Sequence, residues 1–154
     1  MPEKIYHLSL EWKPVAAVGD LPGLEVRVDG VLLSDLVCDW ENAHESDNSK
    51  KIAQAHGPII RYHSSYLHSW LGEKLSEEDV APPSKASLLG CSCGEVGCWP
   101  LQVSVMLNEK TVVWSDFLQP FRPEATIFEG FGPFTFHRAG YEAEVRRAMA
   151  DAPA

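Results

Sequence analysis

The chain has 154 residues and a mass of 17.1 kDa, which suits one domain that buries a substantial core without disulfides or metal. Hydrophobic residues make up 45% and charged residues 23%, a composition typical of globular proteins. The formal net charge of −9 opposes nonspecific binding to nucleic acid and to anionic membranes, and it allows a basic protein as partner.

The first residues, MPEKIYHLSLEW, lack the basic and apolar regions of a signal peptide. No apolar run approaches the ~20 residues of a membrane helix. We therefore expect a cytoplasmic protein, in a compartment where clustered cysteines bind metal or catalyse reactions more often than they form structural disulfides. A single domain is predicted over residues 1–150, and residues 151–154 are expected to fray.

The first predicted elements are strands. In the stretch 3–12, every second residue from Tyr6 onward is apolar, which predicts a strand with one buried face. The apolar positions are Tyr6, Leu8, Leu10 and Trp12. Asp29 and Gly30 lie between two apolar stretches and predict a hairpin turn, because glycine adopts a positive φ at little cost. Ser34 can then cap a short helix over residues 35–42.

The middle of the chain predicts a second helix, with Pro58 in its first turn. Apolar residues recur there at helical spacing: Ile59, Tyr62, Tyr66, Leu67, Trp70 and Leu71. Three of them, Tyr62, Tyr66 and Trp70, form an aromatic face. We expect this face to belong to the core, and it becomes a candidate interaction surface if it is exposed.

The second half is predicted to be mainly strand. Apolar stretches at residues 86–93, 98–107 and 111–117 form a meander, and residues 134–136 form a last strand. A one-sided apolar stripe predicts a helix over residues 139–150. The predicted fold class is therefore α+β: a single antiparallel sheet, made of two hairpin regions and the meander, with two or three helices mainly on one face.

Three of the four cysteines, Cys91, Cys93 and Cys98, lie within eight residues, which we name the cysteine segment. On a strand, Cys91 and Cys93 point to the same face. Gly94 and Gly97 permit a tight reversal that brings Cys98 back toward Cys93. Three sulfurs gathered in this way predict a site for a thiolate-binding metal, with zinc as the expected ion.

A structural zinc ion takes four ligands, and the predicted fourth ligand is Cys38 or His137. Two other interpretations stay open. One is a reversible redox pair of Cys93 and Cys98, although the C-x-x-C spacing of such pairs is missing. The other is that the cysteines are small buried side chains in a glycine-rich hairpin. The C-x-C…C spacing is not a standard structural zinc pattern, so the spacing does not choose among the three.

Three motifs follow one another here: C-x-C-G-x-x-G-C-x-P, W-x-x-F-x-x-P-x-R and P-F-x-F-x-x-x-x-Y. Together they resemble the motifs of a group of uncharacterised bacterial proteins. The matching residues are Cys91, Cys93, Gly94, Gly97, Cys98, Pro100, Trp114, Phe117, Pro120, Arg122, Pro133, Phe134, Phe136 and Tyr141. The resemblance covers the last third to half of the chain. It implies one recurring domain, and it implies no activity, cofactor or partner.

Other motifs of catalysis and binding are missing from the sequence. H-E-x-x-H, G-x-S-x-G and G-x-x-x-x-G-K-[ST] do not occur. His56, His63 and His68 are seven and five residues apart, spacings that do not place them on one helical face. We therefore expect a non-enzymatic binding or interaction domain with a protein partner. The alternative is a small thiol- or metal-dependent enzyme centred on the cysteine segment.

Overall fold

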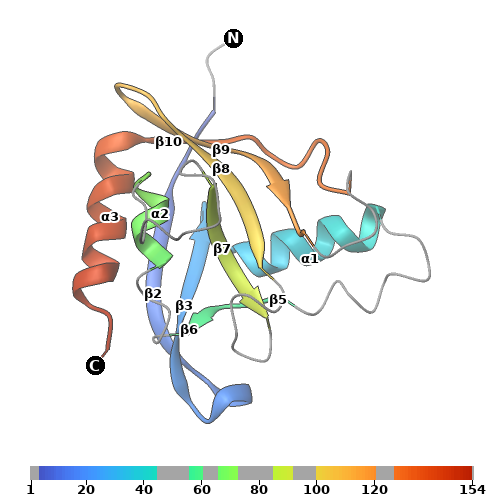
Figure 1. The fold of residues 1–154 in the computed structure, drawn as a ribbon, viewed down its shortest axis with the longest axis vertical. Helices are drawn as coiled ribbons and strands as arrows, with labels where there is room; N and C mark the ends of the chain where they lie inside the picture. Colours follow the sequence, from blue (N-terminus) through green and yellow to red (C-terminus); the bar gives the residue numbers. More distant parts are fainter. Residues whose placement is uncertain are drawn as a thin grey trace.

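The computed structural model describes residues 4–44, 56–60, 66–72, 85–91, 100–120 and 127–153. Over these residues the protein is a mixed α/β fold, with two sheets and three α-helices (Figure 1). The first elements are β1 (Ile5–Tyr6), β2 (Leu8–Val15), β3 (Leu21–Val28), β4 (Val31–Leu32) and α1 (Leu33–His44). The middle of the chain contains β5 (His56–Gly57), β6 (Ile59–Ile60), α2 (Leu67–Trp70) and β7 (Lys85–Cys91). The last elements are β8 (Leu101–Leu107), β9 (Thr111–Leu118), β10 (Phe134–His137) and α3 (Arg138–Ala150).

The larger sheet has six strands in the order β1-β10-β9-β8-β7-β5. Its centre is the predicted meander β7-β8-β9, in which neighbouring strands are antiparallel, and β10 joins β9 in the same sense. At the outer edge, β1 pairs with β10 in parallel, so the sheet is mixed. Val103, Val112 and Trp114 of the meander are completely buried, which gives the sheet one strongly apolar face.

The smaller sheet is built on the β2-β3 hairpin, whose two strands pair along all eight residues of each. Leu8 and Leu10 are buried, as the alternation of β2 predicts. The turn between β3 and β4 has φ values of 51° at Asp29 and 80° at Gly30, so the predicted hairpin is confirmed. Further along β3, β6 pairs with the same edge as β4.

The prediction of a single antiparallel sheet is met only in part. Most neighbouring strands are antiparallel, but the strands divide into two sheets, and β1 runs parallel to β10. Alternation of apolar residues identifies which face of a strand is buried, and it does not identify the strand that pairs with it. Because both sheets bury side chains in one core, their strands look alike in the sequence.

The predicted helix beginning at Pro58 is wrong in its first part. Here β5 pairs with β7 and β6 pairs with β3, so the short segment His56–Ile60 joins the two sheets. Ile59 and Ile60 are adjacent and both buried, as expected for a segment enclosed on both sides. Residues 61–65 lie outside the described residues, and the helix α2 covers only Leu67–Trp70.

Aromatic side chains form much of the core. Trp70 of α2, Trp114 of β9 and Tyr141 of α3 have at most 2% of their surface exposed. The rings of Trp70 and Trp114 meet edge to face with centroids 5.6 Å apart, and Trp114 meets Phe136 at 4.7 Å. Such pairs add about 0.5–1.5 kcal/mol beyond the area they bury. The cluster thereby joins two helices to the larger sheet.

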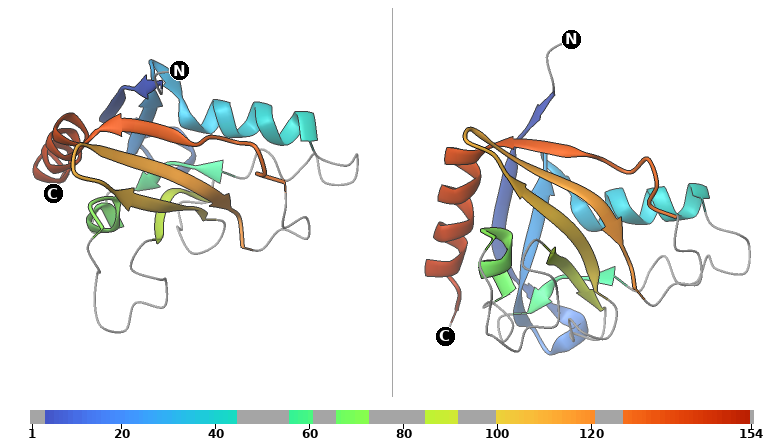
Figure 2. Two further views of the ribbon diagram at one scale, coloured as in Figure 1. Left: turned by 90° about the horizontal axis from the view of Figure 1, so that it is seen from above. Right: turned by 45° about the horizontal axis from the view of Figure 1, so that its top comes forward.

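The helix α3 lies at one side of the molecule and α1 at the opposite side (Figure 2). Tyr141 and Val145 of α3 are buried, which confirms the predicted stripe. The polar side of α3 contacts β2: Glu144 accepts a 2.8 Å hydrogen bond from the Leu10 amide, and Arg147 donates one to the Leu10 carbonyl. Hydrogen bonds from α3 therefore occupy both backbone groups of Leu10.

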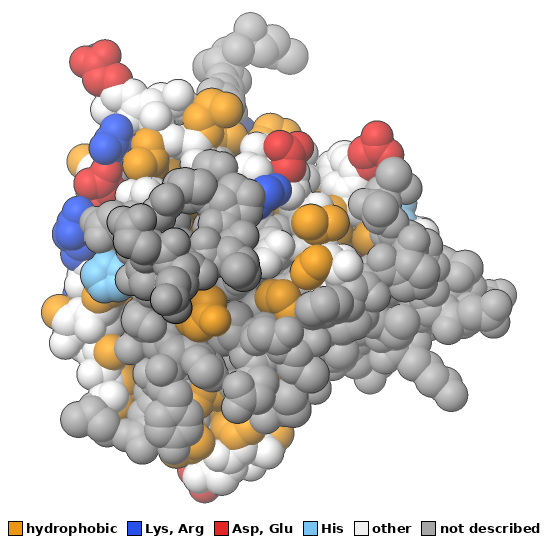
Figure 3. Space-filling model, in the orientation of Figure 1, with side chains coloured by type: hydrophobic (Ala, Val, Ile, Leu, Met, Phe, Trp, Pro, Cys, Tyr) orange, Lys and Arg blue, Asp and Glu red, His pale blue; other side chains and the backbone are white. Residues whose placement is uncertain are grey.

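Exposed large hydrophobic residues are few within the described ranges: Ile5, Val31, Met106 and Leu107. On the face drawn in Figure 3, hydrophobic side chains appear in several small groups among charged and polar ones. In the part of the chain that the structure describes, none of the helices has the length and apolar character needed to cross a membrane. Beyond α3, Asp151 accepts a 2.9 Å hydrogen bond from Arg147.

Candidate functional site

The cysteine segment is described only at its first residue. Cys93 and Cys98 lie outside the described residues, so the predicted convergence of three sulfurs stays a prediction. Cys91 is the last residue of β7 and is partly exposed. Its surroundings are therefore the part of the predicted site that can be examined directly.

His56 lies directly opposite Cys91. The two short strands pair antiparallel, with His56 facing Cys91 and Gly57 facing Gly90. Directly opposite residues of an antiparallel pair project to the same face of the sheet, with Cβ atoms about 5 Å apart. The imidazole and the thiol are therefore neighbours on one face.

Glu41 approaches the same histidine from α1. Its Oε1 lies 3.0 Å from His56 Nε2, and the side chains of Glu41 and His56 are 0% and 2% exposed. The contact has the distance of an ion pair without the angle of a directed hydrogen bond. Removing a carboxylate from water costs free energy unless a partner compensates its charge. The position of His56 relative to α1 is therefore constrained by Glu41.

His137, one of the two predicted fourth ligands, is far from Cys91. It lies opposite Thr111, at the end of the sheet where β8 finishes, whereas β8 begins beside the residues next to Cys91. The seven residues of β8 span about 23 Å at 3.3 Å per residue. An ion bound to Cys91 cannot reach His137 across that distance.

Cys38, the other predicted fourth ligand, lies on α1, three residues before Glu41. Its Sγ accepts a hydrogen bond from Asn42 Nδ2 at 3.6 Å. Burial, followed by the charges of Asp39 and Glu41, raises the pKa of the Cys38 thiol. Metals bind the thiolate, so these surroundings disfavour Cys38 as a ligand.

Within the described residues, no three side chains of His, Cys, Asp or Glu form a group that could hold a metal ion. His56 and Cys91 supply two donors, and the Glu41 carboxylate lies 3.0 Å from Nε2 of the imidazole. This set of groups serves two chemistries. Sulfur and nitrogen can bind a metal, with the carboxylate orienting the imidazole. Alternatively, the imidazole can activate the thiol as a nucleophile.

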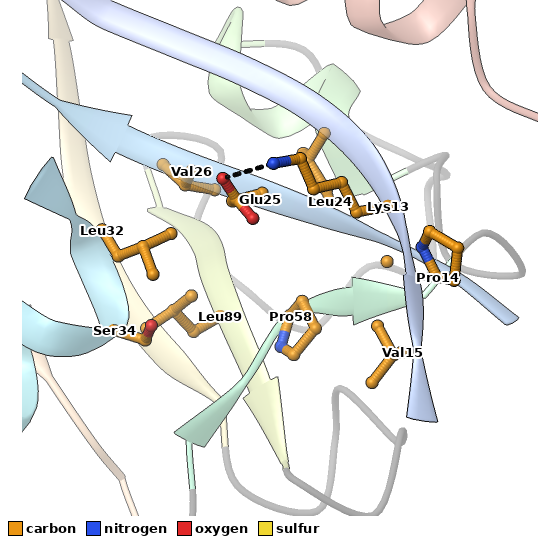
Figure 4. A pocket seen from close by; sticks show the side chains of 11 residues that line it. Lys13, Pro14, Val15, Leu24, Glu25, Val26, Leu32, Ser34, Pro58 and Leu89 are labelled. Carbon is orange, nitrogen blue, oxygen red and sulfur yellow. Dashed lines mark ion pairs between the residues drawn. The ribbon is translucent and has the colours of Figure 1, made fainter. Parts of the chain in front are cut away.

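A pocket of about 170 Å³, drawn in Figure 4, is lined by Pro58 and Leu89, each two residues along the chain from His56 and Cys91 respectively. Pro58 and Leu89 form one wall, and Leu89 is on the face of β7 that carries Cys91, because residues two apart on a strand share a face. Residues of the β2-β3 hairpin, Val15 among them, also line the pocket. The pocket and the Glu41–His56–Cys91 cluster thus share strands but not side chains.

Two of the three residues of the predicted aromatic face, Tyr66 and Trp70, lie within the described residues. Trp70 is completely buried, and its Nε1 donates a 2.9 Å hydrogen bond to the carbonyl of Ser87, so it belongs to the core. Tyr66 is partly buried against the core. Tyr62 lies outside the described residues.

Sequence reasoning missed both Glu41 and the position of His56. One signal was present: Glu41 follows Leu33 and Val37 at spacings of four residues, so a carboxylate lies on the buried stripe of α1. An acidic residue on such a stripe needs a buried partner. No comparable signal places His56, because its pairing with β7 spans more than thirty residues of chain.

Comparisons of the chain with family models, with curated proteins and with solved structures find no match. The resemblance to the group of bacterial proteins therefore stays a prediction from the motifs.

Proposed function

We propose that this protein is a cytoplasmic binding domain with a structural zinc site at the edge where β5 meets β7. In this proposal Cys91 and His56 bind the ion, and His56 takes the place predicted for Cys38 or His137. Cys93 and Cys98, predicted from the sequence alone, complete the four ligands that a structural zinc ion requires. The single observation that carries the proposal is the pairing of His56 with Cys91.

The position of Glu41 supports a metal-binding role for His56. Histidines that bind metals usually interact through their other ring nitrogen with a carboxylate or carbonyl, which fixes the ring and makes it a better donor. Glu41 lies against Nε2, so Nδ1 is the nitrogen assigned to the metal. A negative carboxylate close by also favours a cationic centre over an empty site.

The role of such a site is to hold chain segments together. It connects the bridging segment His56–Ile60 to β7, while Glu41 connects the same segment to α1. The zinc ion thereby stabilises one side of the pocket in Figure 4, whose wall contains Pro58 and Leu89. With a net charge of −9, the expected macromolecular partner is a basic protein and not a nucleic acid or a membrane.

The same geometry favours a second candidate, a thiol-dependent enzyme. Cys91 would be the nucleophile, His56 the base and Glu41 the group that orients the base. The partial exposure of Cys91 supports this role, because a nucleophile has to reach its substrate. Three cysteines within eight residues favour the metal, because a nucleophilic site needs only one.

Metal analysis of the full chain, purified without a histidine tag, tests the proposal. We expect stoichiometric zinc in the natural chain and its loss in Cys91→Ser and in His56→Gln. The matched controls Cys38→Ser and His137→Gln should keep their zinc. Glu41→Gln should retain the ion with an affinity about 10–100-fold lower, as for other changes behind metal-binding histidines.

Zinc retained by both Cys91→Ser and His56→Gln would overturn the proposed ligand set. A metal-free natural chain would exclude the zinc site. In that case the rate of alkylation of Cys91 in the folded protein decides the second candidate: rapid modification that slows in His56→Gln supports an activated thiol, and modification only after unfolding contradicts it.

A further inference from the structure

The pocket in Figure 4 lies at a gap along the edge of β3. There β6 pairs with Gly23 and Leu24, and β4 pairs with Arg27 and Val28. The intervening residues, Glu25 and Val26, line the pocket. The cavity is therefore a consequence of how β4 and β6 share one strand edge.

The pocket has room for one small apolar group. Its volume is about 170 Å³, and cavities of ~150 Å³ lined by apolar side chains accommodate benzene. Most of its lining is apolar and includes Leu32, Pro58 and Leu89. Gly23 allows Val15 and Pro58 to pack close to the β3 backbone, because a Cβ at position 23 would lie 2.6 Å from Val15 Cγ2 and 2.9 Å from Pro58 Cγ. The space suits a branched or aromatic amino-acid side chain and is too small for a nucleotide cofactor.

Two opposite charges lie along one side of this apolar space. Lys13 Nζ and Glu25 Oε1 are 3.5 Å apart, as the dashed line in Figure 4 shows. Their side chains are 47% and 19% exposed, so both are reachable from solvent. Glu25 Oε1 also accepts a 2.8 Å hydrogen bond from Arg27 Nε. The Lys13–Glu25 pair resembles in spacing the ammonium and carboxylate groups of an α-amino acid, which are ~3 Å apart. A zwitterion laid against the pair would place each of its charges beside an opposite one.

We propose that this pocket binds a free α-amino acid with an apolar side chain, of the leucine, isoleucine, methionine or phenylalanine type. The side chain occupies the space beside Pro58 and Leu89. The carboxylate of the ligand contacts Lys13, and its ammonium group contacts Glu25. This inference goes beyond the zinc proposal and does not depend on it, because neither of the two zinc ligands that the structure describes, His56 and Cys91, lines the pocket.

Isothermal titration calorimetry of the full chain with L-leucine tests the inference. We expect saturable binding in the micromolar to millimolar range, the range open to a ligand of this size. Two analogues separate the charges: 4-methylpentanoic acid lacks the ammonium group, and isopentylamine lacks the carboxylate. Each analogue should bind at least about tenfold more weakly than leucine, because the loss of a hydrogen bond to a charged group costs at least that factor in affinity. L-Serine, which cannot fill the apolar space, should bind more weakly by a similar factor.

Variants locate the binding in this pocket. Lys13→Met and Glu25→Gln should each weaken leucine binding about tenfold. The matched control is Glu11→Gln, because Glu11 also pairs with Lys13, at 3.7 Å, but does not line the pocket. Ser34→Phe, which adds bulk to the pocket wall, should abolish binding, and its circular dichroism spectrum checks that it folds.

Three results would overturn the inference. The first is the absence of saturable heat with every apolar amino acid at millimolar concentration. The second is equal binding of leucine and its two singly charged analogues, which would make the pocket a site for apolar molecules in general. The third is unchanged binding in Lys13→Met and Glu25→Gln.

Discussion

The hydroxyl of Tyr141 donates a 2.7 Å hydrogen bond to the carbonyl oxygen of Trp70. The same hydroxyl accepts a 3.0 Å bond from Trp114 Nε1, and all three side chains are buried. Burial raises the pKa of the Tyr141 phenol, so the hydroxyl keeps its proton as the donor. One oxygen atom thus connects α3 to α2 and to the larger sheet.

Tyr141→Phe should destabilise the protein by about 1–3 kcal/mol, because it leaves a buried carbonyl and a buried indole N–H without this partner. Urea denaturation at neutral pH measures the free energy of unfolding. Tyr6→Phe is the matched control, because Tyr6 is a partly exposed tyrosine whose ring packs on Phe134. A Tyr141→Phe effect no larger than that of Tyr6→Phe would show that the network contributes little.

Removing one partner of the buried Glu41–His56 pair should lower the free energy of unfolding more than replacing both partners with apolar residues. In metal-free protein, His56→Leu leaves the Glu41 carboxylate buried and should cost about 3–5 kcal/mol. The double variant Glu41→Leu/His56→Leu removes both polar groups and should recover most of that loss. Chemical denaturation in the presence of a chelator gives all the free energies of the cycle. A double variant as unstable as His56→Leu alone would contradict this account.

The contact of Glu144 with β2 should make stability depend on pH. The hydrogen bond from Arg147, and then that from the Leu10 amide, lowers the pKa of Glu144 in the folded protein. Its contribution to stability is therefore complete above the pKa of the unfolded chain and is lost as the pH falls through the folded value. The difference in unfolding free energy between the natural chain and Glu144→Gln should be complete at neutral pH and should shrink as the pH falls below the ordinary glutamate pKa of about 4.3.

The control for this measurement is Glu142→Gln, a change in the same helix at a carboxylate that pairs with Arg138 within α3. Its effect should be smaller than that of Glu144→Gln at neutral pH. An effect of Glu144→Gln that stays constant with pH would show that the carboxylate charge does not contribute.

Asp29 combines a left-handed backbone with a hydrogen bond to the backbone of His7, the residue before β2. Its φ is 51°, and its Oδ1 accepts a 2.7 Å bond from the amide of His7, which also lowers the pKa of the carboxyl group. Asp20 has a φ of 63° and provides a matched position. We expect Asp29→Ala to cost about 1 kcal/mol more than Asp20→Ala, because only Asp29 also loses the bond to His7. Equal losses in urea denaturation would contradict this role.

Local features of the fold could be predicted from the sequence. The Asp29-Gly30 turn, the meander β7-β8-β9 and the stripe of Tyr141 and Val145 each depend on residues close together in the chain. The first part of the helix predicted from Pro58 is wrong, because Ile59 and Ile60 form the buried strand β6, which pairs with β3. The spacing of apolar residues along the chain does not indicate which distant strand pairs with a buried segment.

The candidate site shows the same limit more strongly. The sequence pointed to Cys91, Cys93 and Cys98, and the expected fourth ligand was Cys38 or His137, chosen by residue type. Their positions depend on strand order and on the pairing of β5 with β7, which follow from long-range packing. Of the two groups that sequence reasoning missed, Glu41 was detectable in advance as an acidic residue on the apolar stripe of α1, and the position of His56 was not.

The bonds from Glu144 and Arg147 to Leu10 also protect the outer edge of the smaller sheet. Among the described strands, β2 pairs only with β3, and an uncovered outer edge invites strands of other chains. The helix α3 supplies a carboxylate and a guanidinium at the place where another strand would supply its carbonyl and amide. Loss of α3 would therefore remove buried apolar area and also expose the backbone of β2 to pairing with strands of other chains. The helix α3 thus protects the β2-β3 hairpin from edge-to-edge aggregation.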